Sequence, residues 1–242
     1  MDDQIVASIL PLRVQRLCYS VGGVQAIRNV SFEIVAGSRN IILGANGAGK
    51  SVLLRLLHGL LPPSSGEIIW NKNNAAAHQA MVFQRPVMLR RTVIDNIIFA
   101  LNLNNRHLDI KSVAKEASAA LASVGLAHLT DRAARHCSGG EQQRIALARA
   151  WALKPEVLFL DEPTASLDPT ATKAIEEIMA DISRAGTTII MTTHDIGQAK
   201  RLADRILFLH DGRLVEDAPS HRFFDKPESP PAAAFIKGEL LW

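Results

Sequence analysis

Eight residues from Gly44 to Ser51, with the sequence GANGAGKS, constrain this chain more than any other feature. They match the pattern G-x-x-x-x-G-K-[ST], in which backbone N–H groups of a glycine-rich turn surround phosphate groups. The apolar run Ile41–Leu43 precedes the match and the run Val52–Leu57 follows it, which predicts the order strand, turn, helix. The alternative is a plain glycine-rich turn between a strand and a helix. The complete match in that context favours a nucleoside triphosphate site.

Each residue type in this stretch has a predicted task. The helix that begins near Gly49 directs its positive end and its unpaired N–H groups at an anion. Lys50 is expected to reach the β- and γ-phosphates, and the Ser51 hydroxyl is expected to hold Mg²⁺. The residues predicted to contact the nucleotide here are Gly44, Asn46, Gly47, Ala48, Gly49, Lys50, Ser51 and Val52.

Length and composition exclude several classes of protein. The 242 residues suffice for one large or lobed domain with its own core. The formal net charge is only +3, and no block of Lys and Arg predicts nucleic-acid binding. Cys18 and Cys137 are too few for a disulfide framework or a metal cluster, which favours a reducing compartment. The apolar runs are too short to span a membrane, and Asp2 and Asp3 lie where a secretory leader would be basic. We therefore expect a soluble chain without a leader.

Hydrophobic periodicity predicts a helical insertion between two α/β halves. Strand patterns end near Phe83, and from Arg85 to about His136 the apolar spacing is helical. The proline-rich C-terminal end predicts a lightly structured tail that packs back at Phe235–Trp242. The other predicted strands are 12–19, 30–35, 67–70, 80–83, 157–160, 187–192, 205–209 and 213–215, and the predicted helices include 93–101, 110–124, 142–153, 169–184 and 196–203.

Two acidic residues follow a strand pattern that is apolar throughout. Val157–Leu160 predicts a strand buried on both faces, with Asp161 and Glu162 at its carboxyl end. P-loop ATPases keep a Mg²⁺-linked aspartate at this place, and the adjacent glutamate is suited to orient or deprotonate an attacking water. The alternative is an acidic pair exposed to solvent. His194 ends another predicted strand at the sheet edge where α/β proteins bind ligands, although a lone histidine there is equally compatible with a structural role.

Three further positions have an ordinary explanation when taken alone. Ser138 and Glu141 have the spacing of a capping box at the start of a helix. Asp168, followed by Pro169, is a favourable helix N-cap. Tyr19, the only tyrosine, is an ordinary aromatic residue of a strand.

In their order along the chain, however, these residues resemble the ATP-binding cassette of ABC transporters. The Ser-Gly-Gly element separates this family from other P-loop proteins. The resemblance implies an α/β fold over residues 1–242, namely a P-loop NTPase core with an N-terminal antiparallel β-lobe and an inserted helical lobe. The core lobe would comprise residues 1–85 and 154–242, and the helical lobe, with the signature segment, residues 86–153. The matching elements are Gly44–Ser51, Gln84, Ser138–Gln142, Val157–Glu162, Ser166–Asp168 and His194.

The resemblance also implies roles for individual residues around ATP and Mg²⁺. Tyr19 would stack on adenine. Lys50 and the loop amides would hold the phosphates. The implied catalytic residues are Glu162, which acts on the water, His194, which contacts the γ-phosphate, and Lys50. The implied metal residues are Ser51, Gln84 and Asp161.

The signature segment would serve an ATP held mainly by a second copy of the chain. Ser138, Gly139 and Gly140 would contact that nucleotide, so two cassettes would close head to tail with Asp168 in the loop that crosses their interface. The family commonly has leucine at the position of Cys137 and glutamine at that of Glu141. Neither departure removes a group that touches phosphate.

Partners follow from the resemblance as well. With the pore on separate permease chains, the arrangement is typical of prokaryotic importers. The cassette would lie on the cytoplasmic face of the cell membrane as a peripheral subunit, with an external solute-binding protein taking part indirectly and no nucleic acid. Arg85–Arg91 lies where such cassettes receive a cytoplasmic helix of the permease. The alternative is a connector packed on its own domain.

The transported solute is indicated by two short segments. Met81–Arg91 and the ending Gly238–Trp242 are similar to ATPases of tungstate-type oxyanion importers. We therefore expect uptake of tungstate or a related oxyanion. Alternatives are an importer for phosphate or amino acids, an exporter or lipid-trafficking subunit, and a cassette of DNA repair or translation. A P-loop kinase is disfavoured by Ser138–Gly140 and Glu162.

Overall fold

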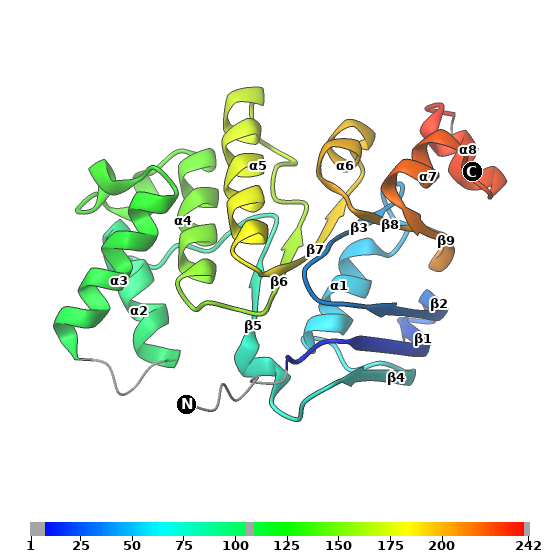
Figure 1. Cartoon of the computed structure of the whole chain (residues 1–242), viewed down its shortest axis with the longest axis horizontal. Helices are drawn as coiled ribbons and strands as arrows, with labels where there is room; N and C mark the ends of the chain where they lie inside the picture. Colours follow the sequence, from blue (N-terminus) through cyan, green and yellow to red (C-terminus); the bar gives the residue numbers. More distant parts are fainter. Residues whose placement is uncertain (1–7, 105–108, 240–242) are drawn as a thin grey trace, which may run out of the picture. The chain divides into compact units, whose positions relative to one another are not determined.

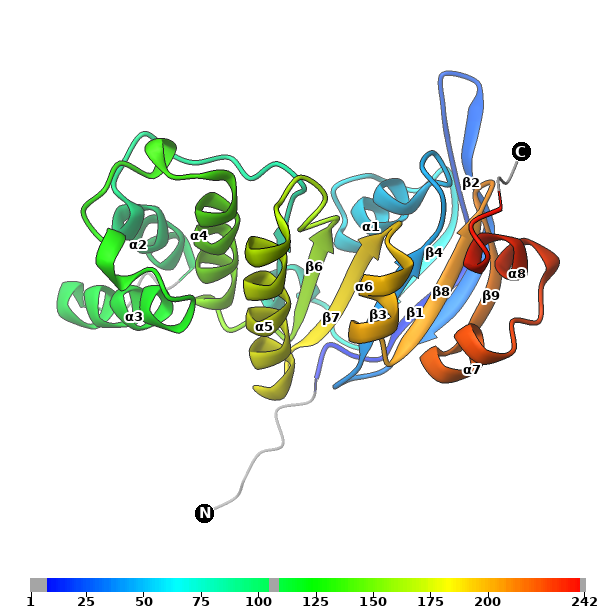
Figure 2. The ribbon, with the colours of Figure 1, turned by 90° about the horizontal axis from the view of Figure 1, so that it is seen from above.

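The fold is described for residues 8–104 and 109–239 of a computed structural model (Figures 1 and 2). The chain forms two compact units. The first unit comprises the chain up to Gln79 and from Thr188 onward, and the second unit comprises Ala80–Thr187. These unit boundaries differ from the predicted lobe boundaries at residues 85 and 153, which stay a prediction.

An antiparallel sheet of the first unit has the strand order β2-β1-β4. Its strands are β1 (Leu12–Val21), β2 (Val24–Ile34) and β4 (Ser65–Trp70). The turn between β1 and β2 is Gly22-Gly23, where both residues have positive φ (57° and 79°), as a two-residue hairpin favours. The antiparallel β-lobe is thereby confirmed. β2 begins six residues before the predicted strand because its first residues lack an apolar alternation and are held by pairing with β1.

Three parallel strands and one antiparallel strand of the second sheet lie in this unit, in the order β7-β3-β8-β9. β3 (Arg39–Leu43) lies between β7 (Thr188–Thr193) and β8 (Arg205–His210), parallel to both, and β9 (Arg213–Pro219) is antiparallel to β8. α1 (Lys50–His58) packs on β7 and α6 (Ile196–Leu202) on β3. The sheet thus brings the ends of β3 and β7 to one edge, where ligands of α/β proteins bind.

The predicted lack of structure in the C-terminal tail is wrong for the described residues, whereas the predicted packing at Phe235 is confirmed by its ring contact with Phe208 at 5.3 Å. α7 (Ser220–Asp225) and α8 (Pro230–Ile236) form there, because Ser229 caps α8 and its first residues are prolines, which suit a helix start. The buried Glu216 carboxylate accepts the N–H groups of Glu228 and Ser229 at 3.0 Å each and the Ser229 hydroxyl at 2.9 Å. Residues 240–242 lie outside the described chain.

The second unit contains a pair of neighbouring strands and four longer helices among its described residues. The strands are β5 (Gln79–Val82) and β6 (Val157–Asp161). α2, α3 and α4 pack on one another, and α5 packs on α4 (Figures 1 and 2). The predicted helices are confirmed, and α4 begins directly after Ser138, as the predicted capping box requires. Their bounds are α2 (Val93–Asn104), α3 (Ile110–Ser123), α4 (Gly139–Trp151) and α5 (Pro169–Arg184).

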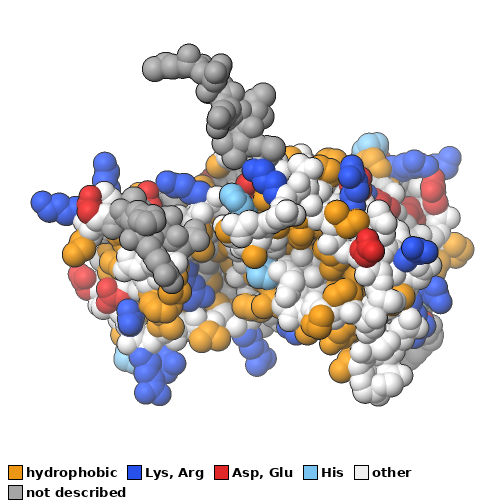
Figure 3. Space-filling model, turned by 90° about the horizontal axis from the view of Figure 1, so that it is seen from below, with side chains coloured by type: hydrophobic (Ala, Val, Ile, Leu, Met, Phe, Trp, Pro, Cys, Tyr) orange, Lys and Arg blue, Asp and Glu red, His pale blue; other side chains and the backbone are white. Residues whose placement is uncertain are grey.

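Charged side chains are dispersed over the surface that Figure 3 draws, where Lys and Arg lie among acidic and hydrophobic side chains. None of the helices formed by residues 8–104 and 109–239 combines the length and the apolar character that crossing a bilayer requires.

Candidate nucleotide-binding site

Three glycines of the 44–51 stretch are required for different reasons. A Cβ on Gly44 would lie 2.2 Å from the Leu209 carbonyl oxygen, so only glycine allows this approach to β8. Gly47 has φ 82°, a conformation that glycine adopts without strain. Gly49 combines both constraints, with φ 99° and a Cβ position 2.7 Å from the Ala26 carbonyl oxygen.

Backbone contacts hold the same stretch from behind. Ala48 N–H donates to the Ala45 carbonyl at 3.2 Å, and the Gly212 N–H donates to the Ala48 carbonyl at 3.1 Å. Arg28 in turn donates its N–H to the Gly212 carbonyl at 2.8 Å and forms an ion pair with Asp211 at 2.7 Å. The β8–β9 turn and β2 therefore fix the loop before any ligand binds.

The front of the loop is suited to phosphate. Gly49 is the N-cap of α1 and provides no side-chain cap, and the positive end of this nine-residue helix favours an anion. Lys50 is 5% exposed, and its Nζ donates to the Ala45 carbonyl at 3.0 Å within the loop. A fixed backbone cradle with a buried lysine at the helix start fits the phosphates of a nucleoside triphosphate.

His194 is brought to this loop by strand register. Leu43 pairs with Thr193 on the parallel strands β3 and β7. Gly44 and His194 are therefore the residues that directly follow these two adjacent strands. His194 is exposed at this edge. Tyr19 lies on β1 opposite Ile27 and is partly exposed.

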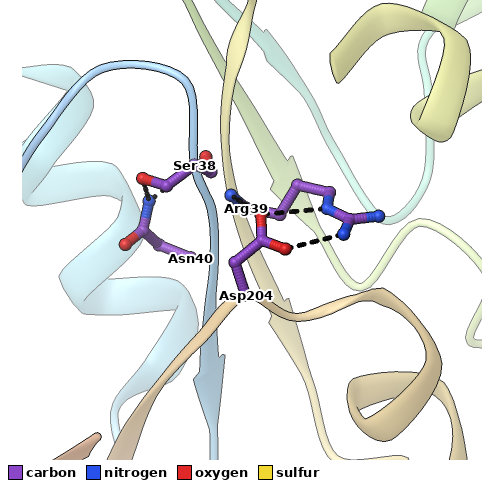
Figure 4. A network of polar contacts seen from close by, with 4 residues as sticks. All are labelled: Ser38, Arg39, Asn40 and Asp204. Atoms are coloured by element: carbon purple, nitrogen blue, oxygen red, sulfur yellow. Dashed lines mark hydrogen bonds and ion pairs between the residues drawn. The ribbon is translucent and has the colours of Figure 1, made fainter. Parts of the chain in front are cut away.

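A polar network fixes the opposite end of β3 (Figure 4). The Asp204 carboxylate accepts hydrogen bonds from Arg39 Nη2 at 2.7 Å, from Arg39 Nε at 3.1 Å and from the Arg39 N–H at 2.9 Å. These bonds, led by those from the guanidinium, lower the pKa of Asp204 below its ordinary value. The buried Asn40 donates to Ser38 Oγ at 2.9 Å. Sequence reasoning missed this network, whose only signal is a charged residue at the start of β3 and an opposite charge directly before β8.

Asp161 and Glu162 lie where the sequence predicts them, at the end of β6 in the second unit. Asp161 is its last residue and is 2% exposed. Glu162 has φ 41°, a left-handed conformation uncommon for a residue with a side chain, and its carbonyl accepts the Ala165 N–H at 3.2 Å. Such strain is typical of functional sites. Gln84 is exposed, two residues beyond β5.

The capping box at the start of α4 is confirmed. Ser138 N–H donates to Glu141 Oε2 at 2.6 Å, and Glu141 N–H donates to Ser138 Oγ at 3.3 Å. The bond from the Ser138 N–H lowers the pKa of Glu141. The N–H groups of Gly139 and Gly140 have no acceptor among residues 8–104 and 109–239. The helix start therefore keeps two N–H groups, with its positive end, for an anion.

Gly140 also allows a close helix contact that sequence reasoning missed. A Cβ at Gly140 would lie 2.9 Å from the Cβ of Ala171 on α5, whereas one at Gly139 would lie 3.8 Å from Leu167 Cδ2. Asp168 caps α5 by accepting the Ala171 N–H at 2.9 Å. The structure thus places Asp168 beside the Ser138–Gly140 segment, within the second unit.

Comparison with known proteins identifies the family. The family model described as ABC transporter matches residues 27–165, which is more than half of the chain. The chain belongs to the ABC transporter family. It is an ATP-hydrolysing enzyme of that family, coupled to transmembrane transport.

Relatives of this ABC ATPase align over almost its whole length. The arginine transport ATP-binding protein ArtM of Bacillus subtilis is 34% identical over 93% of this chain and 98% of its own length. The phosphate import ATP-binding protein PstB 2 of Natronomonas pharaonis is 34% identical over 96% of this chain and 88% of its own length.

Solved structures agree with the fold of this ABC ATPase. The structure of cbiO1 from Clostridium perfringens, part of the ABC transporter complex cbiONQ, has 30% identity and a TM-score of 0.81, covering 91% of this chain and 93% of that one. An ATP-binding cassette solved as a dimer in a post-hydrolysis state with ADP and Pi has 26% identity and a TM-score of 0.77, covering 86% of this chain and 98% of that one. The predicted ABC ATPase fold is confirmed.

Proposed function

We propose that this ABC ATPase powers uptake of tungstate, or a closely related oxyanion, through a separate permease. An external binding protein would deliver the anion to that permease. The observation that carries the solute is the segment Met81–Arg91, similar to that of tungstate-type importers. The ending Gly238–Trp242 adds to it, although residues 240–242 lie outside the described chain. Named relatives include importers of phosphate and aliphatic sulfonates, which supports an oxyanion. Relatives named for arginine and glutamate transport make an amino acid the second candidate.

For hydrolysis, the residues of each unit have complementary proposed roles. Lys50, Tyr19 and the amides of Gly44–Val52 hold ATP. Glu162 orients the attacking water and takes its proton as the bond from the water oxygen to the γ-phosphorus forms and the bond to ADP breaks. His194 contacts the γ-phosphate. The residues proposed to hold Mg²⁺, which neutralises phosphate charge when bound, are Ser51, Gln84 and Asp161.

The proposed assembly is a head-to-tail dimer in which Ser138, Gly139 and Gly140 serve the nucleotide of the second copy. The two N–H groups at the start of α4 that lack an acceptor in the described chain support this role. The dimeric cassette structure with 26% identity supports it as well. Asp168, beside this segment, would lie at the dimer interface.

Docking to the permease is proposed at Arg85–Arg91, which would hold the subunit on the cytoplasmic face of the membrane. Within that segment the Val87 side chain is 70% exposed, whereas Met88 is 4% exposed. Met88 therefore anchors the segment and Val87 remains available for an apolar contact with the permease.

The solute is tested by deleting the gene and following cellular tungsten, molybdenum, phosphate and arginine at sub-micromolar supply. We expect a selective tungsten deficit that is repaired by the wild-type gene and by Lys173→Ala, an exposed lysine on α5, but not by Lys50→Ala. Loss of arginine or phosphate uptake with unchanged tungsten uptake would transfer the assignment to that solute.

A further inference from the structure

The proposed docking segment Arg85–Arg91 is held through its backbone by two arginines. Arg149 Nη1 donates to the Val87 carbonyl at 3.1 Å, and Arg135 Nε donates to the Met88 carbonyl, also at 3.1 Å. Hydrogen bonds from a charged donor are about twice as strong as neutral ones. Since the Val87 side chain is exposed, the segment turns its side chain outward and its carbonyl inward.

The two arginines flank α4, one in its last turn and the other in the turn Ala134–His136 that precedes its N-cap. Arg149 lies in the last turn of α4, whereas Arg135 precedes the N-cap Ser138 by three residues. At a rise of about 1.5 Å per residue, the ten residues from Gly139 to Arg149 span about 15 Å. The docking segment is therefore attached both to the far end of α4 and to the turn that leads into its N-cap.

Arg149 has few other interactions. Burial lowers the pKa of its guanidinium. Within residues 8–104 and 109–239 it forms no ion pair, and its hydrogen bond goes to the Val87 carbonyl. An arginine placed only to keep α4 soluble would project into water or pair with a carboxylate. Arg149 instead donates its hydrogen bond to the backbone of the docking segment.

A third tie binds the segment to another helix. Asn96, fully buried in the first turn of α2, accepts the Leu89 N–H at 2.9 Å through Oδ1 and donates to the Thr92 carbonyl at 2.8 Å. This tie fixes the segment's far end on α2, so movement near Val87 reaches the Ser138 N-cap along α4 from Arg149 and through the turn that contains Arg135.

We propose that Arg149 and Arg135 are positioning residues that transmit displacement of the Arg85–Arg91 segment to Ser138, Arg149 along α4 and Arg135 through the turn before it. This inference rests on the proposed function, in which Ser138 contacts the nucleotide of the second copy. A partner that docks on Val87 then controls closure of the dimer. Because coupling between two sites is reciprocal, closure of the dimer also changes the surroundings of Val87.

The reciprocal effect can be measured without the permease. In the full chain carrying Cys18→Ser and Glu162→Gln, Val87→Cys is labelled with an environment-sensitive fluorophore, while the buried Cys137 stays unlabelled. We expect Mg-ATP to change the fluorescence as the dimer forms. Arg149→Met and Arg135→Met should each reduce the change at least threefold, and Arg149→Lys, which keeps a charged donor, should retain at least half of it. A label at Leu103→Cys, exposed on α2, is the matched control and should not respond.

Sedimentation of the same samples shows whether the dimer forms, independently of whether its formation is transmitted to Val87. Thermal melts confirm that each variant is folded. If the dimer forms and either Arg→Met variant keeps the full fluorescence change, or the Val87 label never responds, the transmission is refuted. If no dimer forms with Mg-ATP, the head-to-tail assembly is refuted and this inference falls with it.

Discussion

Replacing Gly140 with alanine is expected to destabilise the protein, whereas the same change at its neighbour Gly139 is not. The new Cβ at position 140 would lie 2.9 Å from the Cβ of Ala171. Carbon atoms pack best at about 3.5–4.0 Å, so α4 and α5 would have to separate by about 0.6–1.1 Å. Neither Cβ can rotate away, because both are fixed to helix backbone. At Gly139 the nearest atom is 3.8 Å away, which is an ordinary contact.

The magnitude follows from two opposing effects. Overpacking of a close contact costs about 1–3 kcal/mol. Alanine returns at most about 1 kcal/mol over glycine through helix propensity. We therefore expect Gly140→Ala to lower the free energy of unfolding by about 0.5–2 kcal/mol, and Gly139→Ala to leave it unchanged or slightly raised.

Urea unfolding of four proteins measures the contact itself. Gly140→Ala, Ala171→Gly, the double variant and the wild type form a double-mutant cycle, in which the smaller residue at 171 makes room for the larger one at 140. We expect a coupling free energy of about 1–3 kcal/mol. A Gly140→Ala protein as stable as the wild type, or a coupling below about 0.5 kcal/mol, would show that the helices separate freely and that the packing argument is wrong.

Three further outcomes are expected. Glu162→Gln should bind Mg-ATP but lose about 10²–10⁴ in turnover, as expected when a general base is removed; steady-state turnover within tenfold of wild type would contradict its role. Ser138→Arg should block ATP-driven dimerisation of the Glu162→Gln protein in sedimentation, because it adds bulk and charge at the start of α4, whereas Ser138→Thr, which keeps the hydroxyl, should not; dimers of the arginine variant would count against the model. Asp204→Asn should destabilise the chain in a pH-dependent way, since the pKa of Asp204 is lower in the folded state than its ordinary value of about 3.9. The wild-type advantage in urea unfolding should be constant above that pH and disappear as the pH falls through the folded-state pKa, so an advantage that persists in acid would refute the argument.

Local patterns predicted the parts of the fold that depend on local physics. The glycine-rich turn was predictable because its glycines, lysine and serine stand at fixed spacing within a single segment. The apolar run before Asp161 gave a buried strand for a similar reason. The capping box of Ser138 and Glu141 is a contact over three residues, and the sequence contains all of it.

Long-range contacts account for what the sequence did not predict. Gly44 approaches Leu209 across 165 positions of the chain, and Asp204 binds Arg39 over the same separation, so no local pattern contains either contact. The two C-terminal helices were missed because prolines were interpreted as breakers, whereas Glu216 on β9 fixes the turn before α8 and the prolines begin that helix. The attachment of Val87 to Arg149 likewise depends on tertiary packing alone.

The left-handed backbone of Glu162 has a consequence for anyone who selects improved variants of this protein. An L-residue in that conformation costs about 1–2 kcal/mol, which glycine avoids. Selection for heat resistance alone would therefore enrich glycine at position 162 and, if the carboxylate acts as proposed, remove turnover in the same step. A thermostability screen needs a parallel turnover assay, because at this residue a gain in thermal stability would come with a loss of activity.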